Sequence, residues 1–418
     1  MRRIRILEGK KKDRFAREME KRGNSDLAKI ELTVRRIVND VRRNGERALR
    51  RYATRWDGLE KSEPVRVPES DLQDAWKRAS PELRDAITQA AENIRRYGEW
   101  QKPKEWRREI QPGVCVGQLV RPLESVGCYV PGGRYPLPST LLMTVIPAQV
   151  AGVPQIRVAS PHPAQVTMAA AAFLGVHEFY RIGGAQAIAA FAYGTENIPR
   201  VDKIVGPGNR HVTAAKKLVA LDCAIEFLAG PTEAVFISEN GDPHFLACDL
   251  VAQAEHDPDA LCILITPSRG LATAVQKYIE QRTGQNPIAA ESLSLHGAIL
   301  LVDSLDESVD ISNRIAPEHL TLPAGLVHAV KNAGSIFLDE FTPQSAGDYI
   351  SGPNHVLPTG TVARVRGGLS VLDFVRLISC QEVSPEGIRR IAPPAIALAE
   401  AEGLRGHAES LRVRCSRA

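Results

Sequence analysis

From about residue 124 onward, short apolar runs alternate with Ala-rich segments that carry a helical pattern. Val126–Val130 is typical of a strand, and the turn sequence Pro131-Gly132-Gly133 follows it. This alternation predicts two α/β units, each a parallel sheet with helices on both faces. Strands are predicted at 126–130, 156–159, 178–182, 203–205, 234–237, 261–265, 298–302 and 336–338, with helices near 164–174, 185–193, 243–255, 270–282 and 325–333.

The segments outside these two units are predicted to be helical. Residues 26–56 carry apolar side chains at three- and four-residue steps, and Asp57-Gly58 ends the pattern. A second helix is expected at about 81–97. The chain is again expected to be helical from about residue 367, because 392–403 is Ala-rich and Gly403 is a suitable C-cap.

Composition excludes several classes of function. Lys+Arg and Asp+Glu are nearly balanced at 53 and 49, so the charge does not favour nucleic acid as a partner. The seven cysteines include no CxxC pair, which argues against a disulfide framework and a cysteine zinc site. No apolar run is long enough to span a membrane, and the basic N-terminus has no apolar stretch behind it. A soluble, cytoplasmic protein is expected.

Two glycine-containing turns lie where a strand leads into a helix. Gly206-Pro207-Gly208-Asn209 and Gly183-Gly184-Ala185-Gln186 would aim backbone N–H groups and a helix N-terminus at an anion. Glycine at such a position more often reflects ordinary turn chemistry, and the dinucleotide fingerprint GxGxxG is absent. Because parallel sheets bind ligands at the carboxyl ends of their strands, we expect the functional residues there.

A few polar side chains stand out as candidates for chemistry. Gln253 and His256 are three residues apart, so on a helix they share a face and could hold one ion, although a histidine near a helix C-terminus is common. Glu318 and His319 could serve as acid and base near neutral pH, although such adjacent pairs also arise by chance. Asp348 lies in a Gly/Pro-rich loop that could equally be a simple turn.

Taken together and in order, the motifs resemble the histidinol dehydrogenase family over nearly the whole chain. Each is weak alone, but seven in the right order are specific. They are Tyr129-Val130-Pro131-Gly132-Gly133, Gly183-Gly184-Ala185-Gln186-Ala187, Gly206-Pro207-Gly208-Asn209, Gln253-Ala254-Glu255-His256, Ala316-Pro317-Glu318-His319-Leu320, Gly352-Pro353-Asn354-His355-Val356-Leu357-Pro358-Thr359 and Ala399-Glu400-Ala401-Glu402-Gly403-Leu404.

The resemblance implies oxidation of L-histidinol to L-histidinal and then to L-histidine, with two NAD molecules reduced. It also implies one zinc ion per site, which would bind the amino and imidazole nitrogens of the substrate. Glu318 and His319 would be the acid–base pair. The implied zinc ligands are Gln253, His256, Asp348 and His407; the implied NAD contacts are Tyr129, Gln186 and Asn209; the implied substrate contacts are Thr232, Gln253, His256, His319, Asp348, Glu402 and His407.

The same resemblance implies a domain plan and a dimer. The expected fold is α/β, with two Rossmann-like parallel-sheet domains plus small helical N- and C-terminal extensions. Residues 1–25 would form the N-terminal extension, 26–128 with 230–366 a discontinuous first α/β domain, 129–229 the NAD-binding second domain, and 367–418 the tail. The expected assembly is a homodimer in which the tail completes the partner's site.

One residue departs from the family pattern. Thr232 stands in Gly230-Pro231-Thr232-Glu233 where the family usually has Ser, which keeps the hydroxyl but adds a methyl group near the substrate. A related zinc/NAD dehydrogenase acting on another small alcohol therefore stays an alternative. A non-enzymatic binding protein is disfavoured, because no implied catalytic residue or ligand is lost.

Overall fold

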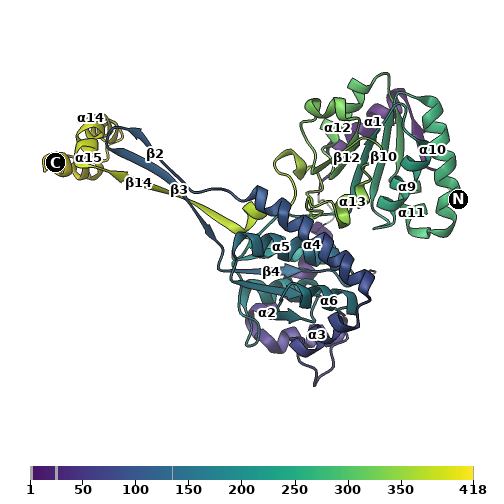
Figure 1. Cartoon of the computed structure of the whole chain (residues 1–418), viewed down its shortest axis with the longest axis horizontal. Helices are drawn as coiled ribbons and strands as arrows, with labels where there is room; N and C mark the ends of the chain where they lie inside the picture. Colours follow the sequence, from purple (N-terminus) through teal and green to yellow (C-terminus); the bar gives the residue numbers. More distant parts are fainter. Residues whose placement is uncertain (1–2, 24–26, 134, 418) are drawn as a thin grey trace.

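The computed structural model describes residues 3–23, 27–133 and 135–417, and Figure 1 shows their arrangement. Two α/β units, the first lobe and the second lobe, lie side by side, and a long arm projects from the second lobe. The first lobe is built on a six-stranded sheet, and the second lobe on a five-stranded sheet. No described helix is long and apolar enough to cross a membrane.

The sheet of the first lobe has six parallel strands. Their order is β1 (Arg5–Leu7), β11 (Ala298–Leu301), β10 (Leu261–Thr266), β9 (Glu233–Ile237), β12 (His319–Leu322) and β13 (Ser335–Leu338). One face packs against α9 (Pro243–Ala254), α10 (Arg269–Arg282) and α11 (Pro287–Leu295), and the other against α1 (Gly9–Glu20) and α12 (Leu305–Ile315). Because both faces are covered, the central strands are apolar at successive positions.

The sheet of the second lobe has five parallel strands. Their order is β6 (Glu178–Tyr180), β5 (Gln155–Ala159), β4 (Ser125–Tyr129), β7 (Lys203–Val205) and β8 (Ala224–Ile225). Helices α2 (Leu27–Trp56), α7 (Gly184–Tyr193) and α8 (Arg210–Val219) form one core with it. Helices α3 (Glu69–Arg78), α4 (Pro81–Gln101), α5 (Pro138–Ala151) and α6 (Gln165–Phe173) form the other.

The fold class predicted from the alternating pattern is confirmed, with two parallel sheets where two were expected. The helices between residues 27 and 101 belong to the second lobe and not, as the domain plan expects, to the first. Helix α2 buries Val34, Val38 and Leu49 in the core of the second lobe, and α3 and α4 pack there too, whereas residues 26–128 were grouped with 230–366. The expected boundary between residues 25 and 26 lies outside the described residues.

The expected N-terminal extension is not separate from the first lobe. Strand β1 pairs in parallel with β11, and α1 buries Phe15 and Ala16 against the same sheet. Two other elements also differ from the prediction. The helix expected at 325–333 is a short 3-10 helix, Ala324–Ala329, and β12 was not predicted at all.

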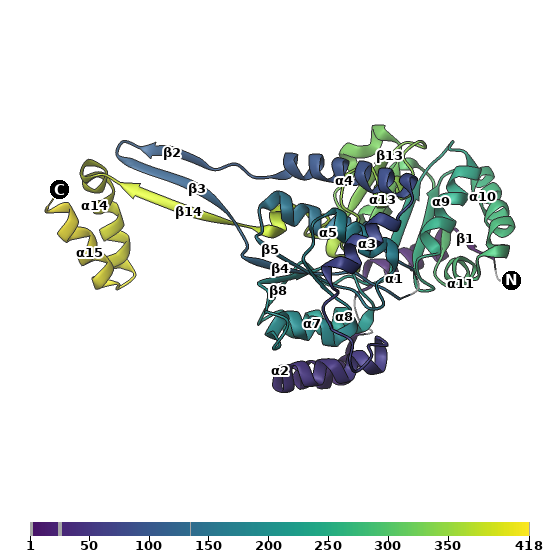
Figure 2. The ribbon, with the colours of Figure 1, turned by 60° about the horizontal axis from the view of Figure 1, so that its bottom comes forward.

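The arm is an antiparallel sheet that carries a pair of helices. It consists of β2 (Trp106–Gln111), β3 (Val114–Pro122) and β14 (Val375–Val383), with α14 (Pro385–Ala401) and α15 (Arg405–Cys415) at its far end (Figure 2). The prediction of an entirely helical segment after residue 367 is therefore wrong for β14. Several apolar side chains of the arm are exposed, among them Ile110, Leu377 and Leu398.

Candidate functional site

The candidate catalytic residues lie at the amino edge of the first lobe's sheet. Strand β12 begins at His319 and β9 begins at Glu233, and these two residues flank Glu318. The expectation that these residues follow strands is therefore wrong in the first lobe. It holds in the second lobe, where Tyr129 ends β4 and Gly206 follows β7.

The two lobes touch next to this edge. Asn354 Nδ2 donates to the carbonyl of Met143 at 2.6 Å, and His355 Nε2 lies 3.2 Å from Thr140 Oγ1. Both Thr140 and Met143 belong to α5, which follows β4. The amino edge of one sheet thus faces the carboxyl side of the other, and a substrate and a dinucleotide could meet between them.

His319 stands at the centre of the candidate site. Its Nδ1 is 3.7 Å from Glu318 Oε2 and its Nε2 is 3.5 Å from Asp348 Oδ1. The ring stacks on Phe337 at 5.8 Å between centroids. Both ring nitrogens are buried and lack a hydrogen-bond partner among the described residues. Buried polar atoms without partners are uncommon, so this ring is available to a ligand.

Burial and neighbouring charges shift the pKa values here in opposite directions. Burial raises the pKa of Glu318, whose Oε2 accepts a 2.9 Å hydrogen bond from the backbone N–H of Glu233. Burial also works against the charged form of His319, but the carboxylates of Glu318 and Asp348 outweigh it and raise the pKa of that ring to about 10. The pKa of Asp348 is lowered, because its contact with His319 outweighs its burial. The protonation state of His319 therefore depends on the charges of Glu318 and Asp348.

The candidate metal ligands from the first lobe converge on Asp348. Asp348 lies in the short helix α13 (Gln344–Tyr349), and Gln253 lies in the last turn of α9. Gln253 Nε2 donates to Asp348 Oδ2 at 3.1 Å, and the buried Gln253 Oε1 has no hydrogen-bond partner among the residues described. His256 follows the C-cap of α9 and is exposed.

This donor set fits a divalent cation. An amide oxygen, a carboxylate and imidazole nitrogens are acceptable zinc ligands. Among the described residues, no group of three His, Cys, Asp or Glu side chains is placed to hold a metal. Of the candidate ligands, the structure brings Gln253 and Asp348 into direct contact within one chain.

The remaining predicted contacts divide into one that joins the site and two that do not. Thr232 precedes β9 and is half-buried at the same sheet edge, where its carbonyl accepts from Leu261 N at 2.8 Å. Glu402 and His407 are exposed at the far end of the arm, well away from the first lobe in both views (Figures 1 and 2). One chain alone does not bring all the predicted site residues together.

The predicted NAD contacts gather at the carboxyl side of the second lobe's sheet. Tyr129 Oη accepts from Gly184 N at 3.1 Å, and burial raises the pKa of this phenol to about 12. Asp57 Oδ2 accepts from both Gly183 N and Gln186 Nε2, each at 3.0 Å. Asn209 is exposed and caps α8 through its side chain. The pattern around Asp57 indicates only a turn, because the contacts of Asp57 are with a segment more than 100 residues away in the chain.

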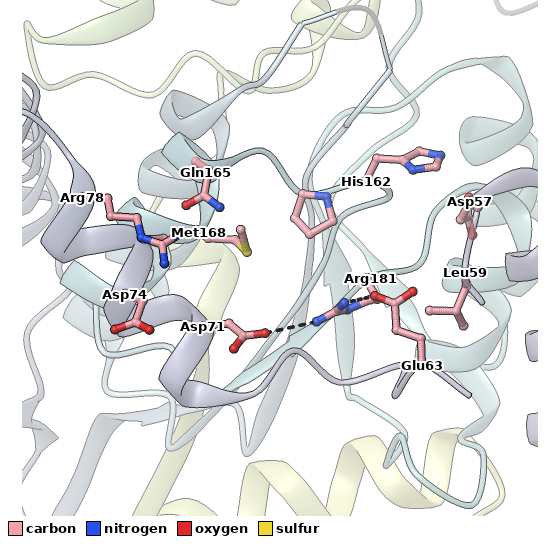
Figure 3. A pocket seen from close by; sticks show the side chains of 13 residues that line it. Asp57, Leu59, Glu63, Asp71, Asp74, Arg78, His162, Gln165, Met168 and Arg181 are labelled. Atoms are coloured by element: carbon pink, nitrogen blue, oxygen red, sulfur yellow. Dashed lines mark hydrogen bonds and ion pairs between the residues drawn. The ribbon is translucent and has the colours of Figure 1, made fainter. Parts of the chain in front are cut away.

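A pocket of about 500 Å³ adjoins these residues (Figure 3). Asp57 and His162 line one end of it, and Asp71, Asp74 and Arg78 line the other. Arg181 crosses its floor and pairs with Glu63. Carboxylates outnumber the basic side chains of this lining, so the pocket suits hydroxyl and amine groups better than phosphates. Because Asp57 also holds Gln186, the pocket and the NAD candidates share one wall.

A buried ion pair supports the turn that precedes Asn209. Lys216 Nζ lies 2.5 Å from Glu226 Oε1 and donates to the carbonyl of Gly206 at 3.1 Å, while Gly206 N donates to the same carboxylate oxygen at 2.9 Å. Both side chains of the pair are almost fully buried, at 3% and 1% exposed. The pair therefore fixes the backbone on both sides of Gly206.

We expect Lys216→Met to lower the free energy of unfolding by about 3–5 kcal/mol, because it leaves the Glu226 carboxylate buried without a partner. The matched control is Lys217→Met, which removes the next residue's exposed pair with Glu31 and should change stability little. Urea denaturation of the two variants measures the difference. Equal, small effects would show that the buried pair is not needed to hold this turn.

Comparison with known proteins decides which family these features belong to. The family model described as histidinol dehydrogenase matches residues 20–415. The chain belongs to the histidinol dehydrogenase family. The resemblance read from the seven motifs is therefore confirmed, and the chain is an oxidoreductase.

Individual members of the histidinol dehydrogenase family match over nearly their full length. Histidinol dehydrogenase from Methanothermobacter thermautotrophicus is 46% identical over 415 residues, covering 95% of this chain and 96% of that protein. The Geobacter sulfurreducens enzyme is 43% identical, covering 94% of this chain and 95% of that protein. A crystal structure of histidinol dehydrogenase from Elizabethkingia anophelis matches with a TM-score of 0.93 at 34% identity, covering 100% of this chain and 99% of that one. Histidinol oxidation in histidine biosynthesis is the activity that this family supports.

Proposed function

We propose that the chain catalyses the zinc- and NAD-dependent four-electron oxidation of L-histidinol, through L-histidinal, to L-histidine. The observation that carries the proposal is a set of buried polar atoms near Asp348 that have no hydrogen-bond partner in the part of the chain that the structure describes. They are Gln253 Oε1 and both ring nitrogens of His319, and Glu318 lies beside that ring. Such a cluster is suited to binding a cation and a polar substrate and to moving protons next to them.

Zinc would be held by Gln253, His256 and Asp348 of one chain, with His407 of the partner subunit as the fourth ligand. A bound zinc ion would supply a redox-inactive centre for the amino and imidazole nitrogens of the substrate. Support for the metal comes from the donor types and from the convergence of Gln253 on Asp348 at 3.1 Å. Thr232 of the first chain and Glu402 of the partner subunit would complete the substrate contacts.

NAD would be held by Tyr129, Gln186 and Asn209, which lie on the carboxyl side of the second lobe's sheet. When bound, NAD supplies the hydride acceptor for each of the two oxidations. Support comes from the exposed N-terminus of α8 at Asn209, which suits an anionic group, and from the close approach of Gly183 and Gly184 to Tyr129 and Asp57.

Glu318 and His319 would move the protons. In the first oxidation the ring of His319 accepts the proton of the substrate hydroxyl as the hydride leaves the carbinol carbon. His319 must be neutral to act as this base, and Asp348, one of the two carboxylates that raise the pKa of the ring, would be engaged as a metal ligand. In the second oxidation Glu318 accepts a proton from the water that adds to the aldehyde carbon. Burial, which raises the pKa of Glu318, makes this carboxylate a stronger base.

The assembly would be a homodimer in which each arm reaches the partner's first lobe. The observation that supports it is the separation of Glu402 and His407 from every other candidate site residue in one chain. The exposed apolar side chains of the arm, such as Ile110 at 70% and Leu398 at 68% exposed, also suit burial against a second copy. A two-fold dimer would build two identical composite sites.

The yield of NADH tests the proposed reaction. We expect two NADH for each L-histidinol consumed and little free aldehyde, because Glu318 and His319 together serve both oxidations in one place. The measurement is the rise in absorbance of NADH when histidinol is limiting, with chromatography of the products. One NADH with release of the aldehyde would contradict the two-step reaction. Turnover of another alcohol in place of histidinol would instead favour a related dehydrogenase with a different substrate.

A further inference from the structure

We infer that Arg22 and Glu233 form a buried pair that positions Glu318 for the second oxidation. This inference rests on the proposed function, in which Glu318 is the base of that step. Arg22 follows α1 and lies 296 residues before Glu318 in the chain. Its side chain is nevertheless 14% exposed, and that of Glu233 is 7% exposed.

The pair is held at both of its ends. Arg22 Nε lies 2.6 Å from Glu233 Oε1, and Arg22 Nη2 lies 2.5 Å from Glu233 Oε2, which is a two-point contact. Arg22 Nη1 also donates to the carbonyls of Met19 and Ile315, each at 2.7 Å. Gly360 N donates to Glu233 Oε1 at 2.9 Å. The Glu233 carboxylate therefore has three donor groups and little freedom to move.

Glu233 in turn contacts Glu318 through its backbone. The N–H of Glu233 donates to Glu318 Oε2 at 2.9 Å, and this is the hydrogen bond that orients the carboxylate. Arg22 also grips the segment in front of Glu318, because Ile315 ends α12 three residues earlier. One guanidinium thus fixes both the start of β9 and the end of α12, the two pieces of backbone between which Glu318 lies.

The charges of Arg22 and Glu233 also affect the protonation of Glu318. The negative charge of Glu233 raises the pKa of Glu318, as burial does. Arg22 supplies the counter-charge of the Glu233 carboxylate at close range. Without Arg22, this carboxylate would be buried without a counter-charge at the residue whose N–H orients Glu318, which would displace Glu318 or favour its neutral form.

A test can separate this role from a general contribution to folding, because L-histidinal reports on both half-reactions. With NAD and water it is oxidised to histidine, releasing one NADH, and this step uses Glu318. With NADH and a proton it is reduced to histidinol, and this step does not. We expect Arg22→Met to lower kcat for histidinal oxidation by about tenfold or more, within the range of general-base contributions. Its KM values and its rate of histidinal reduction should stay within about twofold of those of the starting protein.

The double variant Arg22→Met/Glu233→Gln should recover most of the lost rate. It removes the unbalanced charge, while the amide oxygen still accepts from Gly360 N and the backbone N–H of residue 233 still reaches Glu318. The matched control is Arg314→Met, which breaks an exposed pair with Glu20 at the end of the same helix α12 and should leave both half-reactions unchanged.

Each other outcome has a distinct meaning. Equal loss of both half-reactions in Arg22→Met, with no recovery in the double variant, would overturn the inference and leave Arg22 as a folding contact only. Unchanged histidinal oxidation in Arg22→Met would overturn it as well. If Arg22→Met does not fold, the double variant alone decides, because the inference requires it to be folded and active. Failure of the unsubstituted protein to oxidise histidinal would instead contradict the proposed function.

Discussion

Mixing two inactive variants, Glu318→Gln and His407→Ala, should restore about one quarter of the activity of the unsubstituted protein. If the arm completes the partner's site, a mixed dimer holds one site with both lesions and one site with neither. Random pairing makes about half of the dimers mixed, and one of the two sites in each is intact. The measurement is histidine formation after the two variants are unfolded together and refolded.

Each variant refolded alone is the control and should stay inactive. The distances in one chain motivate this prediction, because His407 lies at the end of the arm and Glu318 lies in the first lobe. If each site were built within a single chain, every site in the mixture would carry one lesion. Absence of any recovered activity from well-folded mixed dimers would therefore rule out the shared site.

The second large effect is expected from Glu318→Gln in the unmixed protein. The amide keeps the shape and can still accept from Glu233 N, but it cannot take a proton from water. Oxidation of histidinal should slow by about 10²- to 10⁴-fold, while reduction of histidinal by NADH should change by no more than a few-fold. Steady-state rates of the two half-reactions, measured on the same preparation, give the comparison.

Glu46→Gln serves as the control for removing a buried carboxylate. Glu46 is 9% exposed in α2 of the second lobe, away from the catalytic residues, and accepts a hydrogen bond from Thr195. Both half-reactions should persist in that variant. A loss of the same size in both half-reactions of Glu318→Gln would mean that this carboxylate acts on substrate binding rather than on water.

Much of the fold could be predicted because its strands and helices have local sequence patterns that indicate them. The buried strands of the two sheets are short apolar runs, and Gly183 and Gly206 mark the places where strands lead into helices or turns. The arm escaped prediction, since β14 has no clear two-residue alternation and its pairing with β3 joins segments more than 250 residues apart. The docking of α2 on the second lobe is likewise decided by packing and not by local propensity.

In the candidate site, too, residues within recognisable motifs could be predicted, and residues whose partners are distant in sequence could not. The motifs predicted Gln253, Asp348, Glu318 and His319, and the structure brings these four together. The expectation that Glu318 and His319 follow a strand was wrong because β12 was not recognised. That strand has only four residues and begins with a histidine, so it has no clear apolar pattern. Asp57 and Arg22 were missed for another reason: their partners are distant in sequence, and nothing in their own neighbourhood indicates a contact.

A crystal structure of the zinc-loaded protein, with anomalous scattering measured at the zinc edge, tests most directly whether residues of two chains hold the metal. We expect one zinc per chain, with Gln253 Oε1, His256 and Asp348 from one chain and His407 of the partner subunit as ligands at about 2.0–2.2 Å. Zinc held without His407, or by the His407 of the same chain, would contradict it.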